Sequence, residues 1–272
     1  MPPMKSSWRF CAIAALAVAS ALSGAETRLP ADQLAKAIRT DSISIPTPGE
    51  LFAALSKPGK PNWIGQYRGP VPTTYRDRAQ IALNLGGLIA DGFIAVEAKD
   101  SQQVKNIGSD IIKLAKALGV SENLLSRGNS INDFAEGNQW DTLQEELEAT
   151  QNEVKSSMQS HADQDLVILV TLGGWIRGTQ VVTGAIIKNY NEPAAKVLRQ
   201  PGLVRFMQSK VNEISPELRQ ERLVNDVSEQ LTGLEKLVSF PEGKSPSAEE
   251  VQKVNEAVGK LMTEIESKEP PK

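Results

Sequence analysis

Two long apolar segments that contain paired glycines constrain the fold of this chain more than any other feature. Residues 79–98 and 165–187 are apolar around nearly the whole circumference of a helix, which predicts two central helices surrounded by others. Each segment carries Leu-Gly-Gly near its middle, at 85–87 and at 172–174. Glycine inside a helix costs about 0.8–1 kcal/mol relative to alanine. The cost of each pair must therefore be offset by a contact that larger residues would prevent.

Close backbone approach is the contact that these glycines favour. We therefore expect the two apolar helices to cross at four helix-contact glycines: Gly86, Gly87, Gly173 and Gly174. The similarity of 85–89 (LGGLI) to 172–176 (LGGWI) leaves open an internal duplication of one helical unit. Another alternative is that the glycines border a bound ligand instead of a helix.

One charged residue follows each glycine pair within the apolar segments. Asp91 and Arg177 are expected to pair with each other, because an unpaired buried ion costs several kcal/mol. The alternative is a polar anchor inside an apolar ligand pocket. Length alone would allow both segments to span a membrane, but charges near the middle of a bilayer are costly, so we predict buried core helices.

The N-terminal residues predict export. Lys5 and Arg9 precede the apolar run Phe10–Leu22, and Ser23-Gly24-Ala25 offers small residues to a signal peptidase. We predict a signal peptide over 1–25 with cleavage after Ala25, which would make the protein periplasmic or secreted. An uncleaved membrane anchor is the alternative, although the apolar run is short for a transmembrane helix.

Composition limits the mature chain further. The one cysteine, Cys11, lies in the signal, so the mature protein has no disulfide and depends on its core for stability. Without the two cations of the signal, 28 basic residues face 33 acidic ones, which argues against general nucleic-acid binding.

The remaining pattern predicts an all-α helical bundle of about seven to nine helices, with the two Gly-Gly helices at its centre. Capping boxes predict helix starts near Thr47, Asp141 and Ser247. Apolar residues spaced by three and four along 224–238 and 251–265 predict a C-terminal helical hairpin. We expect a bundle over 26–214, the hairpin over 215–267 packed on or next to it, and a disordered tail at 268–272.

The connection 57–78 is the first candidate for a binding surface. It is long for a helical domain, and it carries five cations against the single acid Asp77. Aromatic residues alternating with arginine suit a protein partner or an anionic component of the envelope. The candidate residues are Trp63, Tyr67, Arg68 and Arg76. The alternative is that Trp63, Ile64 and Tyr67 pin this segment across the bundle as a strap, with its cations solvated.

Residues that could carry chemistry are few. The single histidine, His161, stands near Asp163 and Asp165, which together could hold a metal but more plausibly cap neighbouring helices. No nucleophile elbow, phosphate loop or calcium loop is present, so we predict no catalytic residue, metal or cofactor.

Two functions of different kinds follow from this reading. The first is a non-catalytic envelope protein that binds a partner through 57–78, with the C-terminal hairpin as a second candidate surface, and that is not an integral membrane protein once the signal is removed. The second is a carrier of a small ligand or lipid, with an apolar pocket between the central helices. An acid-dependent hydrolase is a third reading, which no motif supports.

Overall fold

The computed structural model describes residues 46–57, 61–120, 127–160 and 163–267; of residue 129 and residues 153–160 it gives the helical backbone only. The expected signal peptide and C-terminal tail therefore lie outside the described residues. Within these ranges the all-α prediction is confirmed, and no strand occurs. Nine α-helices of nine or more residues are found among the described residues, with two single-turn helices and two short 3-10 helices.

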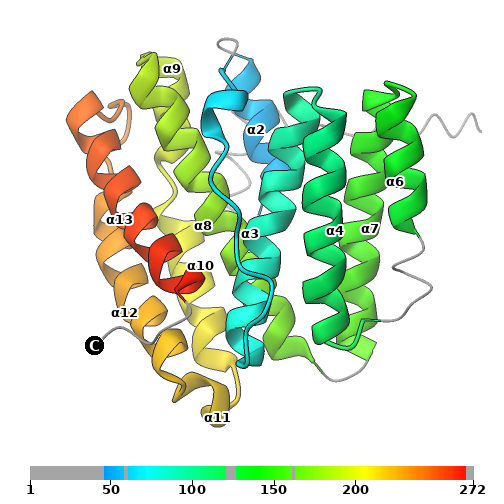
Figure 1. Ribbon diagram of the computed structural model, residues 1–272. Coiled ribbons are helices and arrows are strands. Elements are labelled where there is room, and N and C mark those ends of the chain that lie inside the picture. Colours follow the sequence, from blue (N-terminus) through cyan, green and yellow to red (C-terminus); the bar gives the residue numbers. More distant parts are fainter. Residues whose placement is uncertain (1–45, 58–60, 121–126, 161–162, 268–272) are drawn as a thin grey trace, which may run out of the picture.

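The helices follow one another along the chain, and the connection from α2 to α3 is a long one (Figure 1). Their bounds are α2 Pro48–Ser56, η1 Ile64–Gln66, α3 Arg78–Glu97, α4 Ser101–Ala117, α6 Arg127–Glu136, α7 Trp140–Ser160, α8 Gln164–Lys188, α9 Glu192–Ala195, η2 Lys196–Leu198, α10 Pro201–Glu213, α11 Pro216–Arg219, α12 Arg222–Leu237 and α13 Ala248–Glu266.

Local capping explains several of these starts. Thr47 and Ser247 each form a complete capping box with the glutamate three residues later, which satisfies two backbone N–H groups at the start of α2 and α13. The predicted start at Asp141 is wrong by two positions, because α7 already includes Trp140 and Asp141 lies in its first turn. Asp141 still places a negative charge at the positive end of the helix.

The two apolar helices α3 and α8 lie side by side at the centre of the molecule, as Figure 1 shows. On one side α3 packs against α4 and α7, and α6 packs against both of these helices. On the other side α8 packs against α10 and α13, while α12 packs against α10 and α13. The short helix α2 contacts both central helices.

The C-terminal hairpin belongs to the main core. The buried stripes of α12 and α13 form one hydrophobic cluster with the buried residues of α3 and α8. The helix α13 runs along α8, and the C-terminal end of α13 reaches α3 through hydrogen bonds described below. The hairpin is therefore packed on the bundle.

Both central helices are long and apolar enough to cross a membrane by length and composition alone. In the most apolar stretch of each, 89% of the residues of α3 and 78% of those of α8 are buried within the protein. The apolar surfaces of α3 and α8 are thus covered by other helices of the protein, which is the arrangement expected of core helices.

The crossing of α3 and α8 depends on one glycine from each pair. A Cβ atom built at Gly86 would lie 1.9 Å from the carbonyl oxygen of Val170, and one built at Gly173 would lie 2.0 Å from the carbonyl oxygen of Leu83. No residue with a side chain fits at either position. The backbone of the neighbouring helix, and not a ligand cavity, lies against these two glycines.

Candidate functional site

The predicted binding segment crosses the bundle as a strap, a name we use for residues 61–77. In Figure 1 it runs in extended form over the central helices. Trp63 is only 8% exposed, and its ring packs on Phe52 of α2 with a centroid distance of 5.2 Å. Tyr67 is half-buried, and its hydroxyl donates to Asp100 at 3.4 Å. Burial and the nearby Asp100 carboxylate raise the pKa of Tyr67, so its phenol stays protonated.

The four candidate residues of the strap therefore separate into two groups. Trp63, Tyr67 and Arg68 point inward and hold the strap on the bundle, whereas Arg76 is exposed and makes no ion pair with the described residues. Ile64 is 62% exposed, so the expectation that it would pin the strap together with Trp63 and Tyr67 is wrong for this residue. One isolated exposed apolar side chain is ordinary and does not define an interface.

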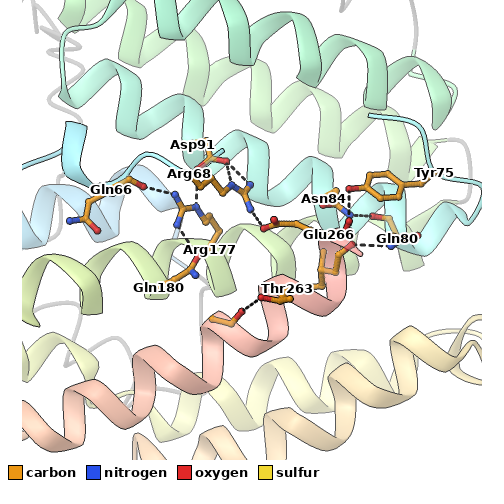
Figure 2. A network of polar contacts seen from close by, with 12 residues as sticks. Gln66, Arg68, Tyr75, Gln80, Asn84, Asp91, Arg177, Gln180, Thr263 and Glu266 are labelled. Carbon is orange, nitrogen blue, oxygen red and sulfur yellow. Dashed lines mark hydrogen bonds and ion pairs between the residues drawn. The ribbon is translucent and has the colours of Figure 1, made fainter. Parts of the chain in front are cut away.

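Arg68 and the two charges of the central helices form a buried ionic network (Figure 2). Asp91 Oδ1 accepts from Arg177 Nε at 2.8 Å, and Asp91 Oδ2 accepts from Arg68 Nε at 2.7 Å. Arg68 also pairs with Glu266 at the end of α13. Two cations and two anions thus balance where four segments meet: the strap, α3, α8 and α13.

The guanidinium of Arg177 is almost completely enclosed. The residue is 4% exposed, and its two terminal nitrogens donate to the Gln66 carbonyl at 2.7 Å and to Gln180 Oε1 at 2.8 Å. Desolvation lowers the pKa of Arg177, and the attraction of Asp91 opposes that shift. A buried ion whose three nitrogens all donate stabilises one arrangement of the chain, and its enclosure leaves no open side for a ligand.

The second glycine of each pair makes room for this network and for α2. A Cβ atom built at Gly87 would lie 3.2 Å from Arg68 Nη2 and 3.3 Å from Met262 Cε. One built at Gly174 would lie 3.3 Å from the carbonyl oxygen of Gly86 and 3.6 Å from the ring of Pro48. The doubled glycine in α3 therefore serves two neighbours, the helix α8 and the side chain of Arg68.

The end of α13 is tied to α3 by side-chain amides. Asn84 Nδ2 donates to the Ile265 carbonyl at 2.7 Å, and Gln80 Nε2 donates to the Ser267 carbonyl, also at 2.7 Å. These carbonyls lie in or just after the last turn of α13, where no intrahelical partner exists. Figure 2 shows Asn84 and Gln80 beside Glu266. These hydrogen bonds and the ionic network together hold the C-terminal end of α13 on α3.

The two aspartates near His161, which were expected to cap helices in preference to holding a metal, have other partners. Asp163 occupies the N-cap position of α8, but its side chain pairs with Arg78 at 3.2 Å and caps no backbone N–H, contrary to expectation. Asp165 accepts from the Ser215 backbone N–H at 3.0 Å. His161 lies outside the described residues, and the described part of the chain contains no cluster of potential metal ligands.

An apolar cavity of about 430 Å³ lies on the other side of α3, between α3, α4, α6 and α7. Most of its wall is aliphatic or aromatic, including Leu85, Ile89 and Phe93 of α3. The cavity also borders Gly92 of α3 and Gly108 of α4. A Cβ atom built at Gly108 would meet no atom within 4 Å, so this position opens onto free space.

Two polar atoms of α7 at this cavity lack partners. Thr150 Oγ1 and Gln151 Oε1 are buried and make no hydrogen bond in the described part of the structure, and both residues line the cavity. Gln151 is only 7% exposed. A buried polar atom without a partner costs about 1–3 kcal/mol, so an occupant that supplies a hydrogen bond would stabilise this wall.

A smaller cavity of about 230 Å³ lies beside the strap, lined by residues of α2, the strap and the end of α8. Gln66 lines it, and its Nε2 donor is buried without an acceptor among the described residues. Its walls are more mixed in polarity than those of the larger cavity. We therefore regard the cavity on the α4 side as the candidate functional site.

Sequence reasoning missed that cavity, although one signal was available. Gly92 and Gly108 are further glycines inside predicted helices, and each carries the same helix-propensity cost as the paired glycines.

Comparison of the chain with known protein families, curated proteins and solved structures gave no match.

Proposed function

We propose that the mature protein is a non-catalytic binding protein of the cell envelope that holds an apolar small molecule between α3, α4, α6 and α7. The observation that carries this proposal is the cavity of about 430 Å³ with mostly apolar walls. Its volume falls within the range of about 300–1,000 Å³ that is typical of ligand pockets. A few polar groups on an apolar wall are also typical, and Thr150 and Gln151 supply them.

The strap gives less support to the alternative, an envelope protein that binds a protein partner through 57–78. Its largest aromatic side chain, Trp63, is used for packing on Phe52, and Arg68 is used for the ionic network. The aromatic anchor that such an interface needs is therefore not available at the surface. The carrier hypothesis remains, with its pocket beside one central helix instead of between the two.

A cavity-filling variant tests the proposal. Nile red, an uncharged fluorescent probe of apolar sites, is titrated into mature wild-type protein and into Gly108→Leu. We expect a saturable site in the wild type and at least about a tenfold loss of affinity in the variant, since the new side chain extends into the free space at Gly108.

Gly233→Leu is the matched control. Gly233 lies in α12, and a Cβ atom there also meets nothing within 4 Å, but the residue does not line the cavity. This variant should bind Nile red like the wild type. Equal affinity of Gly108→Leu and Gly233→Leu, with both proteins folded by circular dichroism, would refute the proposed site.

A further inference from the structure

The charged residues around the cavity are all cations of one helix. Lys105, Lys113 and Lys116 of α4 are the charged side chains in its wall, and neither an acidic residue nor an arginine lines it among the described residues. The whole protein carries more acids than bases, so this local excess of positive charge runs against its overall balance. The helical spacing places Lys105 and Lys116 about 16 Å apart along the axis of α4.

These lysines can receive a further anion even though they already have partners. Lys105 pairs with Glu136 and Lys113 pairs with Asp110 at 2.8 Å, and Lys116 is also engaged. Each of the Lys105–Glu136 and Lys113–Asp110 pairs has one exposed member, because more than half of the Lys113 side chain and of the Glu136 side chain is open to solvent. Such pairs contribute about 0–1 kcal/mol, and an ammonium group has three donors, so exchange with or addition of a ligand anion costs little.

The walls and the cations together favour a molecule with an apolar body and one anionic end. Transfer of each methylene group from water into an apolar site is worth about 0.8 kcal/mol. The cavity volume lies near the lower end of the range for ligand pockets, which favours one hydrocarbon chain over two. The fork of arginine matches carboxylate and phosphate alike, and lysine binds either group as a point charge. A carboxylate carries a single charge, so it costs less to desolvate beside an apolar wall than a phosphate does.

Resting on the binding function proposed above, we infer that this cavity takes a single-chain fatty carboxylate, with the chain against α3 and the inner face of α4 and the carboxylate at one of the lysines of α4. The inference joins the apolar wall formed mainly by α3 and the inner face of α4 to the lysines at the α4 edge. Gln151 and Thr150 remain available inside the cavity for polar groups of the ligand or for water.

Ligands that share a ten-carbon chain test the head group. Decanoate, decanol, decyltrimethylammonium and decyl phosphate compete for Nile red bound to the mature protein. We expect decanoate to bind about tenfold more tightly than decanol, the order of one charge-assisted hydrogen bond, and the cation to bind most weakly. Stronger binding of decyl phosphate than of decanoate would overturn the assignment of a carboxylate.

A triple variant tests the lysines. Lys105→Gln, Lys113→Gln and Lys116→Gln combined should remove the preference for decanoate over decanol while leaving decanol affinity unchanged. The control changes three lysines of α12 and α13, Lys236, Lys253 and Lys260, to glutamine, which alters net charge equally. The control should keep the preference.

In wild-type protein, raising NaCl from about 0.05 to about 1 M should weaken decanoate binding and leave decanol binding unchanged, which tests the same charges without substitution.

The outcomes separate this inference from the function on which it rests. Equal binding of decanoate and decanol, unchanged by the triple substitution and by salt, would overturn the inference and keep an apolar binding site. Failure of Nile red and of all four ligands to bind the wild-type protein would overturn both.

Discussion

On its α8 side, a Cβ atom at Gly86 of α3 would lie 1.9 Å from the Val170 carbonyl, whereas on its α4 side one at Gly92 would lie 3.8 Å from the nearest atoms of Ile107 and Ile111. The same helix thus has one side in backbone contact with its neighbour and another beside a cavity of about 430 Å³. The buried charges Asp91 and Arg177 lie at the α3–α8 interface. Glycine in a helix therefore serves opposite purposes here, close contact on one side and free space on the other.

The difference between these sides also separates stability from function. The α8 side joins α3, α8, α13 and the strap through ion pairs and backbone contact, which leaves little freedom for rearrangement. The α4 side has unsatisfied polar atoms and unfilled space, which cost stability unless an occupant offsets them. Natural proteins tolerate such costs mainly at sites that bind something.

The largest effect is expected from Asp91→Ala on the α8 side. The substitution leaves Arg177 buried without its counter-ion. Arg68 also loses Asp91 and keeps only Glu266 as an ion-pair partner. We expect a loss of about 3–5 kcal/mol in the free energy of unfolding, measured by urea denaturation. The double variant Asp91→Leu/Arg177→Met should lose less than the single one, because it removes the uncompensated charge; a greater loss would contradict the ion-pair account.

Gly173→Ala should come next. Its Cβ would lie 2.0 Å from the Leu83 carbonyl oxygen, so α3 and α8 would have to separate. We expect destabilisation of about 3 kcal/mol, at the upper end of overpacking effects, as a lower melting temperature followed by circular dichroism. An unchanged melting temperature would show that these helices do not touch at this point.

On the α4 side the same substitution should stabilise. Gly108→Ala adds a methyl group where no atom lies within 4 Å, so the gain in helix propensity of about 0.8–1 kcal/mol is not offset by a clash. Differential scanning calorimetry should show a higher melting temperature. A lower one would indicate that α4 packs more tightly here than the structure shows.

The smallest expected effect is a dependence of stability on pH that arises from Glu221, which also lies on the α8 side of α3. Burial, together with a hydrogen bond to Asp77 and repulsion from it, raises the pKa of Glu221 to about 7. The folded state then holds this proton more tightly than the unfolded chain, where the pKa is 4.5. The contribution of Glu221 to stability is therefore full below pH 4.5 and is lost as the pH rises through about 7. Glu221→Gln, which cannot ionise, should flatten the dependence of melting temperature on pH over this interval.

Much of the architecture could be predicted because its signals are local. The apolar segments expected at 79–98 and 165–187 became α3 at Arg78–Glu97 and α8 at Gln164–Lys188, since a pattern that is apolar on all faces has few other uses in a protein core. The paired glycines indicated the crossing because their propensity cost required a compensating contact.

The candidate site could not be predicted in the same way. The direction of Trp63 depends on the position of Phe52 in α2, which is a tertiary contact with no sequence signal. The free space at Gly108 depends on how α6 and α7 approach α4, and a glycine in an amphipathic helix looks the same whether it faces a backbone or a void. Sequence thus indicated which glycines needed explanation but not which explanation applied.

Urea unfolding of Gly86→Ala and Gly92→Ala, measured side by side, tests the difference between the two sides of α3 most directly. Both substitutions have the same intrinsic helix propensity and lie six residues apart in one helix. We predict opposite signs, with Gly86→Ala destabilised by about 3 kcal/mol through overpacking and Gly92→Ala stabilised by up to about 1 kcal/mol. Equal changes in the free energy of unfolding would contradict the account.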